Sequence, residues 1–417
     1  MYSVLKLQKS LAIGRILKPA SIFMVSTMIV NGGNYLYNLW LGRELGPADF
    51  SEVGLLLTFL LILSFAGMTY QLVASKFIID LEDRLISPFI NLMKRRSWQF
   101  GAGLSILTIA FSGGITDFFH LKNHWSVIVF AFSIPVYFLL STERGLLQGR
   151  QSFTGLSVSY QVEIWSKFIS TIALLYIFRD QAGVAIALSM LLSIFISKFI
   201  RKTGFVVHSV SEVKIPGYVI KKIMMFAGFT LGYELIQIAI NYGDMLMVKH
   251  YFDARTAGLY TSIALIGRII YFITWMMVMV LIPTILQKRK DKLPYKSTMF
   301  SYVAIITSVS LFIICLSAGF PELTIRLLFG EAFISFAPML WKYALATSLF
   351  ALANLFIYYF ISTEYYLPVY LAGVFTIAQL GLYLLFHDSI NQIIGIQIVM
   401  MSVLLAVQLG IFVIRKK

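Results

Sequence analysis

Charge is what this sequence has least of: only 13% of its 417 residues are Asp, Glu, Lys or Arg, whereas 59% are hydrophobic. Soluble globular domains carry about 25% charged residues, so this balance excludes a soluble protein. Apolar runs of about 20 residues recur along the whole chain, as in membrane-spanning helices, and the ten-residue alternation of a membrane barrel is absent. The sequence therefore predicts an all-α polytopic membrane protein.

Cysteine, histidine and glycine-rich loops are also scarce, which argues against disulfides, metal sites and nucleotide hydrolysis. The single cysteine, Cys315, lies in an apolar run and excludes disulfides and cysteine metal sites. His120 and His124 bracket Lys122 in a short polar loop, which indicates solvated side chains. No glycine-rich nucleotide loop is found, so we expect no ATP hydrolysis by this chain. We expect a protein that is not an enzyme and has no cofactor or metal.

Hydropathy and turn signals predict twelve spans, and an even number places both termini on one side of the membrane. The expected spans lie at about 17–42, 48–76, 97–118, 124–146, 152–178, 182–204, 219–250, 255–286, 297–320, 333–361, 366–386 and 390–414. Most of the 34 Lys and Arg residues fall on the side of the termini. The positive-inside rule makes that side cytoplasmic, and it explains the net charge of +15 without nucleic acid.

Short similarities repeat at half the chain length. Asn34-Tyr35 matches Asn241-Tyr242, and Ser141-Thr142-Glu143 matches Ser362-Thr363-Glu364 six spans later. Six crossings restore the direction of the chain, so the two halves would be related by a pseudo-twofold axis along the membrane normal. We expect a six-helix lobe at residues 1–205, a cytoplasmic amphipathic linker at 206–222 and a second six-helix lobe at 223–417.

Two expected spans carry a narrow polar face. The seventh has Thr230, Glu234, Gln237, Asn241 and Asp244, and the first has Asn31, Asn34 and Asn38, each set within one helix face. A central Asp facing lipid would cost about 2.5–3.5 kcal/mol. Both faces are therefore expected to line a wet cleft between the lobes.

Charged side chains inside the spans are the candidate functional groups. Arg268 has the charge and shape to hold a phosphate, and it lies at about the depth of Glu234, with which it could pair. Glu163 and Lys167 are four residues apart, a spacing that allows either a structural ion pair or a role with substrate or ion. Asp244, nearer the outer surface, is expected to be a gate or an ion-sensing group.

Several motifs resemble one family along nearly the whole chain. They are Leu41–Phe50, Gly145–Phe153, Ala257-Gly-Leu-Tyr260, Leu328–Phe333 and Ala337–Leu340. The chain resembles the polysaccharide-biosynthesis (Wzx-like) flippases of the multidrug/oligosaccharidyl-lipid/polysaccharide (MOP) exporter superfamily. One departure is Ser51, where the family pattern has glycine.

The resemblance implies a flippase in a bacterial cytoplasmic (inner) membrane that works by alternating access. It would move a polyprenyl-pyrophosphate-linked oligosaccharide to the outer leaflet, with H⁺ or Na⁺ coupling, for O-antigen, capsule or exopolysaccharide synthesis. Its partners would be the bilayer and polysaccharide assembly proteins. Arg268, Lys167, Asn31, Asn34, Asn38 and Asn241 would bind substrate, and Asp244, Glu234 and Glu163 would serve coupling or gating.

Three alternatives stay open at this stage. A MATE-like drug or cation exporter of the same superfamily would use Glu234 and Asp244 for an organic cation, which the basic residues Lys167 and Arg268 argue against. A lipid II flippase would be expected to have two further spans. A polysaccharide polymerase would need a sizeable outer loop with catalytic groups, and the longest expected outer segment, about 319–333, is short and apolar.

Overall fold

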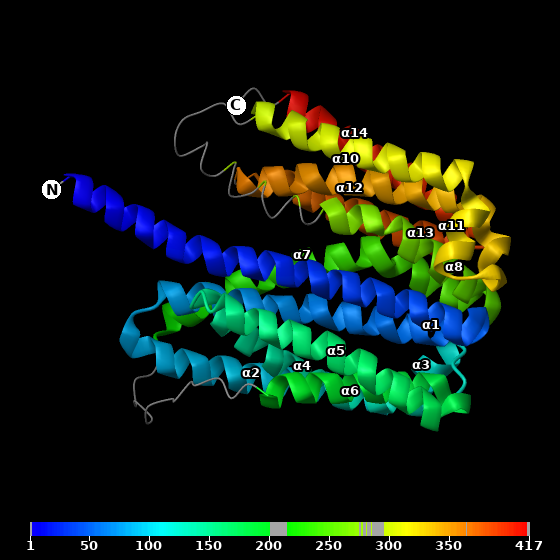
Figure 1. The fold of residues 1–417 in the computed structure, drawn as a ribbon, viewed down its shortest axis with the longest axis horizontal. Helices are drawn as coiled ribbons and strands as arrows, with labels where there is room; N and C mark the ends of the chain where they lie inside the picture. Colours follow the sequence, from blue (N-terminus) through cyan, green and yellow to red (C-terminus); the bar gives the residue numbers. More distant parts are fainter. Residues whose placement is uncertain are drawn as a thin grey trace. The chain divides into compact units, whose positions relative to one another are not determined.

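The structure is a computed structural model that describes residues 2–200, 215–274, 277, 281, 285, 296–363 and 365–414, with side chains from Ile22 onward except at 24, 200, 296–298 and 362. The described residues form helices joined by short turns, without strands, which confirms the prediction of an all-α protein (Figure 1). Parts of the linker 206–222, of the eighth expected span and of the repeat at Glu364 lie outside the described residues, as do many of the basic residues behind the predicted orientation.

The helices follow one another with few long connections. They are α1 Tyr2–Asp80, α2 Asp83–Ala110, α3 Ser112–Phe118, α4 Trp125–Gly149, α5 Phe153–Ile177, η1 Arg179–Gln181, α6 Ala182–Ile200, α7 Gly217–Tyr251, α8 Ala254–Gly267, α10 Lys296–Gly319, α11 Pro321–Leu328, η2 Glu331–Met339, α12 Leu340–Ser362, α13 Leu367–Leu385 and α14 Ile390–Ile414.

Within the described residues, nine helices are long and apolar enough to cross a membrane, or ten if the bent pair α2 and α3 is one span. One of them, Val25–Asp80, has 56 residues, or about 84 Å of helix, enough for two crossings. It is interrupted at Gly46, whose φ of 70° breaks the helical path. These lengths confirm a multi-pass membrane protein, while the count of twelve spans stays a prediction.

The chain divides into two compact units, each described by itself. Unit 1 comprises Met1–Trp40 and Leu56–Leu235. In it α4 packs against α2, α5 and α6. At Gly145 and Gly149 the backbone of α4 lies so close to α1 that a Cβ atom would overlap the backbone of Gln71 and Ser75. This close approach fixes α4 against the second half of α1.

Unit 2 comprises Leu41–Leu55 and Ile236–Lys417, so a short segment of α1 belongs with the second half of the chain. Phe50 packs on Phe329 and Phe333, and Lys249 Nζ donates to Ser51 Oγ over 3.0 Å. The guanidinium of Arg43 donates to the last carbonyls of α11, at Leu327 and Leu328. Ser51, the departure from the family pattern, thus accepts a hydrogen bond that glycine could not.

The rest of unit 2 is built around α12, which packs against α8, α10, η2 and α14, while α13 lies beside α14. The predicted boundaries at residues 205 and 223 and the twofold relation of the lobes stay predictions. The segment Leu41–Leu55 could not be assigned to the second unit by chain order, because only its contacts place it there.

Candidate functional site

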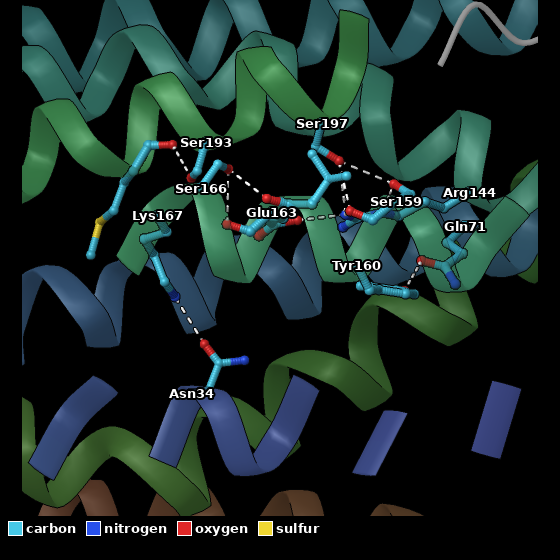
Figure 2. Close-up of polar contacts among 12 residues, drawn as sticks. Asn34, Gln71, Arg144, Ser159, Tyr160, Glu163, Ser166, Lys167, Ser193 and Ser197 are labelled. Atoms are coloured by element: carbon cyan, nitrogen blue, oxygen red, sulfur yellow. Dashed lines mark hydrogen bonds and ion pairs between the residues drawn. The ribbon is translucent and has the colours of Figure 1, made fainter. Parts of the chain in front are cut away.

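Unit 1 has a buried ion pair between α4 and α5. Arg144 Nη2 lies 2.6 Å from Glu163 Oε2, and the same guanidinium donates to Ser159 on α5 and to Ser197 on α6. Arg144 is 1% exposed, and its guanidinium lies 4.0 Å above the ring of Tyr160 (Figure 2). The charges of this pair therefore balance each other within the helix bundle, and Nε and Nη2 of Arg144 both donate hydrogen bonds.

Lys167 lies on the same helix but points away from that ion pair. Its ammonium donates to Asn34 Oδ1 of α1 over 2.9 Å, as Figure 2 shows, and lies 4.8 Å from the centre of the Tyr37 ring. The side chain is only 4% exposed. Both of these partners are uncharged. Glu163, four residues earlier on α5, acts on Lys167 electrostatically but is itself paired with Arg144, so Lys167 is a buried cation without an ion-pair partner among the described residues.

The surroundings of Lys167 are held by a chain of hydroxyl groups. Tyr37 and Thr171 share a hydrogen bond of 2.9 Å, and Thr171 lies 2.8 Å from Ser189 on α6. Thr171 also bonds the carbonyl of Lys167 over 2.7 Å. The ammonium is therefore fixed near the middle of α5, as the fifteenth of 25 residues, about 21 Å along a helix of about 37 Å.

The expected ion pair between Glu163 and Lys167 is wrong as a pairing. Glu163 binds Arg144 on the neighbouring helix instead, over 2.6 Å, while Lys167 donates to Asn34. The spacing of four residues correctly puts both groups on α5, but it could not reveal the competing partner from α4.

The asparagines of α1 lie on one half-buried face, and only one of them reaches Lys167. Asn31, Asn34 and Asn38 all have intermediate exposure. The amide nitrogen of Asn34 bonds the carbonyl of Val30 over 3.1 Å, which leaves its oxygen for Lys167. The oxygen of Asn38 and the hydroxyl of Tyr35 are buried and have no hydrogen-bond partner among the described residues.

Unit 2 has a second buried cluster, around Arg268 at the end of α8. Its guanidinium lies 3.3 Å from Asp244 Oδ1 and donates to the carbonyl of Asn241 over 2.5 Å. It is 4.4 Å from the Tyr242 ring and also contacts the Met245 sulfur, so its charge and most of its hydrogens already have partners on α7. The pairing of Arg268 with Glu234 that the depth in the sequence suggests is wrong, because the structure pairs Arg268 with Asp244.

Asp244 is fully buried, with 0% exposure, although it lies near the end of α7. Its Oδ2 accepts hydrogen bonds of 2.8 Å from both Tyr260 and Tyr343, in addition to the ion pair with Arg268. The carboxylate is thus the centre of a tight network from three helices. Its position in the sequence suggests a group near the outer surface, but packing against α8 and α12 encloses it.

The remaining residues of the α7 face have different surroundings. Asn241 bonds back to the carbonyl of Gln237 over 2.8 Å, and Gln237 donates to Asn354 over 2.9 Å, which ties α7 to α12. Glu234 is 8% exposed, and among the described residues it has neither a hydrogen bond nor an ion pair. No three His, Cys, Asp or Glu side chains gather as metal ligands in the described part of the chain.

Sequence reasoning missed Arg144, Tyr160, Tyr260 and Tyr343 as members of the clusters. Arg144 lies at the end of an expected span, where a basic residue indicates membrane orientation, and a tyrosine in an apolar run indicates a core or interfacial position. One signal was present: Tyr260 ends the motif Ala257-Gly-Leu-Tyr260. Its hydroxyl could not be assigned to Asp244 without the packing of α7 on α8.

Comparisons with known proteins identify the family and related folds. The family model described as "Polysaccharide biosynthesis protein" matches residues 16–289 of the chain. None of the curated proteins compared with the sequence matches it significantly.

Solved structures share the fold at low sequence identity. An inward-facing multidrug resistance MATE family transporter of the MOP superfamily is 13% identical and has a TM-score of 0.76, covering 92% of this chain and 93% of that one. A MATE in the bent conformation is 14% identical, with a TM-score of 0.66 and coverages of 96% and 95%. A MOP superfamily transporter from Pyrococcus furiosus, described as having a binding pocket of reverse polarity that suggests a different function, is 12% identical with a TM-score of 0.60 and the same coverages.

Proposed function

Because this chain belongs to the polysaccharide biosynthesis protein family and has the fold of MOP superfamily transporters, we propose that it is a lipid-linked oligosaccharide flippase. Its substrate would be an oligosaccharide on polyprenyl pyrophosphate, moved from the cytoplasmic to the outer leaflet of a bacterial cytoplasmic membrane. Both termini would face the cytoplasm, and polysaccharide assembly proteins would receive the product.

The observation that carries this proposal is the charge of Lys167. A buried ammonium is costly unless an anion compensates it, and its partners, Asn34 and the Tyr37 ring, are neutral. A pyrophosphate supplies the missing negative charge and can accept hydrogen bonds from Lys167. The asparagines at positions 31, 34 and 38 provide further amide groups along the same face of α1.

Arg268 is the weaker candidate for the phosphate, although its residue type suits one better. Its charge is already balanced by Asp244, and its guanidinium is bonded to the backbone of Asn241 and to Met245. To bind a phosphate it would first have to leave these partners. We therefore assign Lys167 to the substrate and keep Arg268 as part of the Asp244 network.

Coupling to H⁺ or Na⁺ is the proposed drive, with the carboxylates of Glu234, Asp244 and Glu163 as candidates. Glu163 and Asp244 are each paired with an arginine, whereas Glu234 is buried among the described residues without such a partner. An unpaired buried carboxylate can take up a cation or a proton without breaking an existing ion pair. Glu234 is therefore our first choice for the coupling group.

A drug or cation exporter is the second candidate, since the structural matches are MATE and MOP transporters. Such a protein needs a carboxylate free to hold an organic cation, and Glu234 could serve. The uncompensated cation at Lys167 argues for an anionic substrate instead. A polysaccharide polymerase fits neither the transporter fold nor the described turns between helices.

The test is the location of the lipid-linked oligosaccharide in cells that lack the protein. We expect it to accumulate on the cytoplasmic leaflet, with loss of the surface polysaccharide, and we expect sensitivity to organic cations to be unchanged. If the surface polysaccharide is unchanged and the cells become more sensitive to drugs, the flippase proposal is contradicted and the exporter is supported.

Variants connect the phenotype to the site. Lys167→Met should fail to restore the surface polysaccharide although it inserts normally. Lys342→Met is the matched control, because Lys342 also donates to an asparagine, Asn391, over 2.9 Å but in an exposed position. Full complementation by both variants would contradict the assignment of Lys167.

A further inference from the structure

One turn of α1 carries two buried polar atoms that have no partner in the described structure. They are the side-chain oxygen of Asn38 and the hydroxyl of Tyr35. Leaving a buried donor or acceptor unpaired costs about 1–3 kcal/mol. Two such atoms within four residues of one helix indicate a place that a polar ligand completes.

These two atoms lie next to the group that we assign to the phosphate. Asn38 follows Asn34 by four residues on a continuous helix, so the two side chains share one face about 6 Å apart, and Tyr35 adjoins Asn34 in sequence. Asn34 is the residue whose oxygen accepts from Lys167 over 2.9 Å. A ligand with an anionic group at Lys167 would extend about one helical turn to reach Asn38.

The chemistry of the two atoms restricts what can bind them. An amide oxygen only accepts, so Asn38 requires an O–H or N–H donor, whereas a phenol can donate or accept. The sugar joined directly to a pyrophosphate lies within this reach and carries both kinds of group, as ring hydroxyls or as an acetamido N–H. A polyprenyl chain offers neither.

We propose that Asn38 and Tyr35 form the subsite for the first sugar of the lipid-linked oligosaccharide. The proposal rests on the proposed function, in which the pyrophosphate is bound at Lys167. It adds that the protein selects for a sugar on the lipid, and that this selection comes from α1. The subsite distinguishes a loaded carrier lipid from the bare pyrophosphate that remains after the glycan is removed.

The test compares two kinds of lipid on the purified protein. Binding of undecaprenyl pyrophosphate is measured beside binding of undecaprenyl pyrophosphate that carries N-acetylglucosamine, galactose or glucose. We expect wild type to bind at least one sugar-bearing lipid about tenfold more tightly than the bare lipid, as expected for one well-made hydrogen bond. Asn38→Leu and Tyr35→Phe should each reduce this preference while they still bind the bare lipid.

Binding of the bare lipid distinguishes loss of the subsite from loss of fold. Asn391→Leu, which changes an exposed asparagine at the start of α14, should keep the preference. Equal binding of bare and sugar-bearing lipids by wild type, or an unchanged preference in both variants, would overturn the subsite while leaving the flippase proposal standing. If wild type binds none of these lipids, the proposed function fails, and the subsite fails with it.

Discussion

Lys167 on α5 donates a hydrogen bond of 2.9 Å to the side-chain oxygen of Asn34 on α1, and this contact joins a buried cation to a neutral amide. Both residues are in unit 1, in helices that are separated by three others, α2, α3 and α4, along the chain. The pair leaves a positive charge uncompensated in a place where a carboxylate would have been the stabilising partner.

Changing Asn34 to Asp tests whether that missing charge matters. Asn34→Asp would place a carboxylate on Lys167 in nearly the same geometry, so we expect a protein at least as stable as wild type that has lost most of its transport. The melting temperature in detergent and the amount of surface polysaccharide are the two measurements. Asn34→Asp with normal transport would show that the free charge of Lys167 is not used.

The buried pair Arg144 and Glu163 should be a strong contributor to folding. Removing one partner of such a pair costs about 3–5 kcal/mol, because the other charge is left buried and unpaired. We expect Glu163→Gln to lower the melting temperature clearly, and the double change Arg144→Met with Glu163→Leu to recover part of the loss. A double variant less stable than Glu163→Gln would contradict this account.

The loss of stability from changes in the network around Asp244 should grow with the number of interactions removed. Tyr343→Phe deletes one hydrogen bond of 2.8 Å and should cost about 1–2 kcal/mol, whereas Asp244→Ala also leaves Arg268 unpaired and should cost more. Melting temperatures of the two variants test this order. If Asp244 also serves coupling, Asp244→Asn should change the dependence of transport on a proton or sodium gradient, and Tyr343→Phe should change it less.

The segment Leu41–Leu55 is held against α8 by a contact that has no room for a methyl group. At Gly258 a Cβ atom would overlap the carbonyl of Pro47. Gly258→Ala should therefore lower the melting temperature, since backbone must move to admit the side chain. Gly410→Ala in α14 is the control. Apart from the neighbouring backbone of its own helix, no atom lies within 4 Å of a Cβ added there, so alanine should be neutral or stabilising by up to about 1 kcal/mol. Equal effects of the two changes would exclude the close approach as the cause.

Asp253 caps the start of α8 and should make stability depend on pH in acid. Its carboxylate accepts from the Thr256 hydroxyl over 2.6 Å and from the Thr256 amide over 3.0 Å, and these bonds lower the pKa of the Asp253 carboxyl below its usual value. A lowered pKa means that the stabilisation is complete above about pH 4 and is lost as the pH falls through the folded-state pKa. Asp253→Ala should cost about 1 kcal/mol at neutral pH, with a melting temperature that converges with wild type in acid. A constant difference down to pH 2 would contradict this role.

The polar face of α7 shows how far sequence reasoning reaches. Its five members could be identified by helical spacing alone, and burial of all of them is observed, because a helix in an apolar chain must turn such a face away from lipid. Their partners could not be assigned in the same way. Gln237 binds Asn354 more than a hundred residues later, and no local pattern indicates such a pairing.

Amino-acid composition and periodicity alone determined that this is a helical, multi-pass membrane protein, because burial of apolar length in lipid depends on composition and not on neighbours. The motifs along the chain also determined its family. Only the tertiary structure decided which charges are balanced. Arg144 pairs with Glu163 and Arg268 pairs with Asp244, whereas Lys167 contacts an uncharged amide. That outcome depends on which helices pack together, and it moves the candidate phosphate site from Arg268 to Lys167.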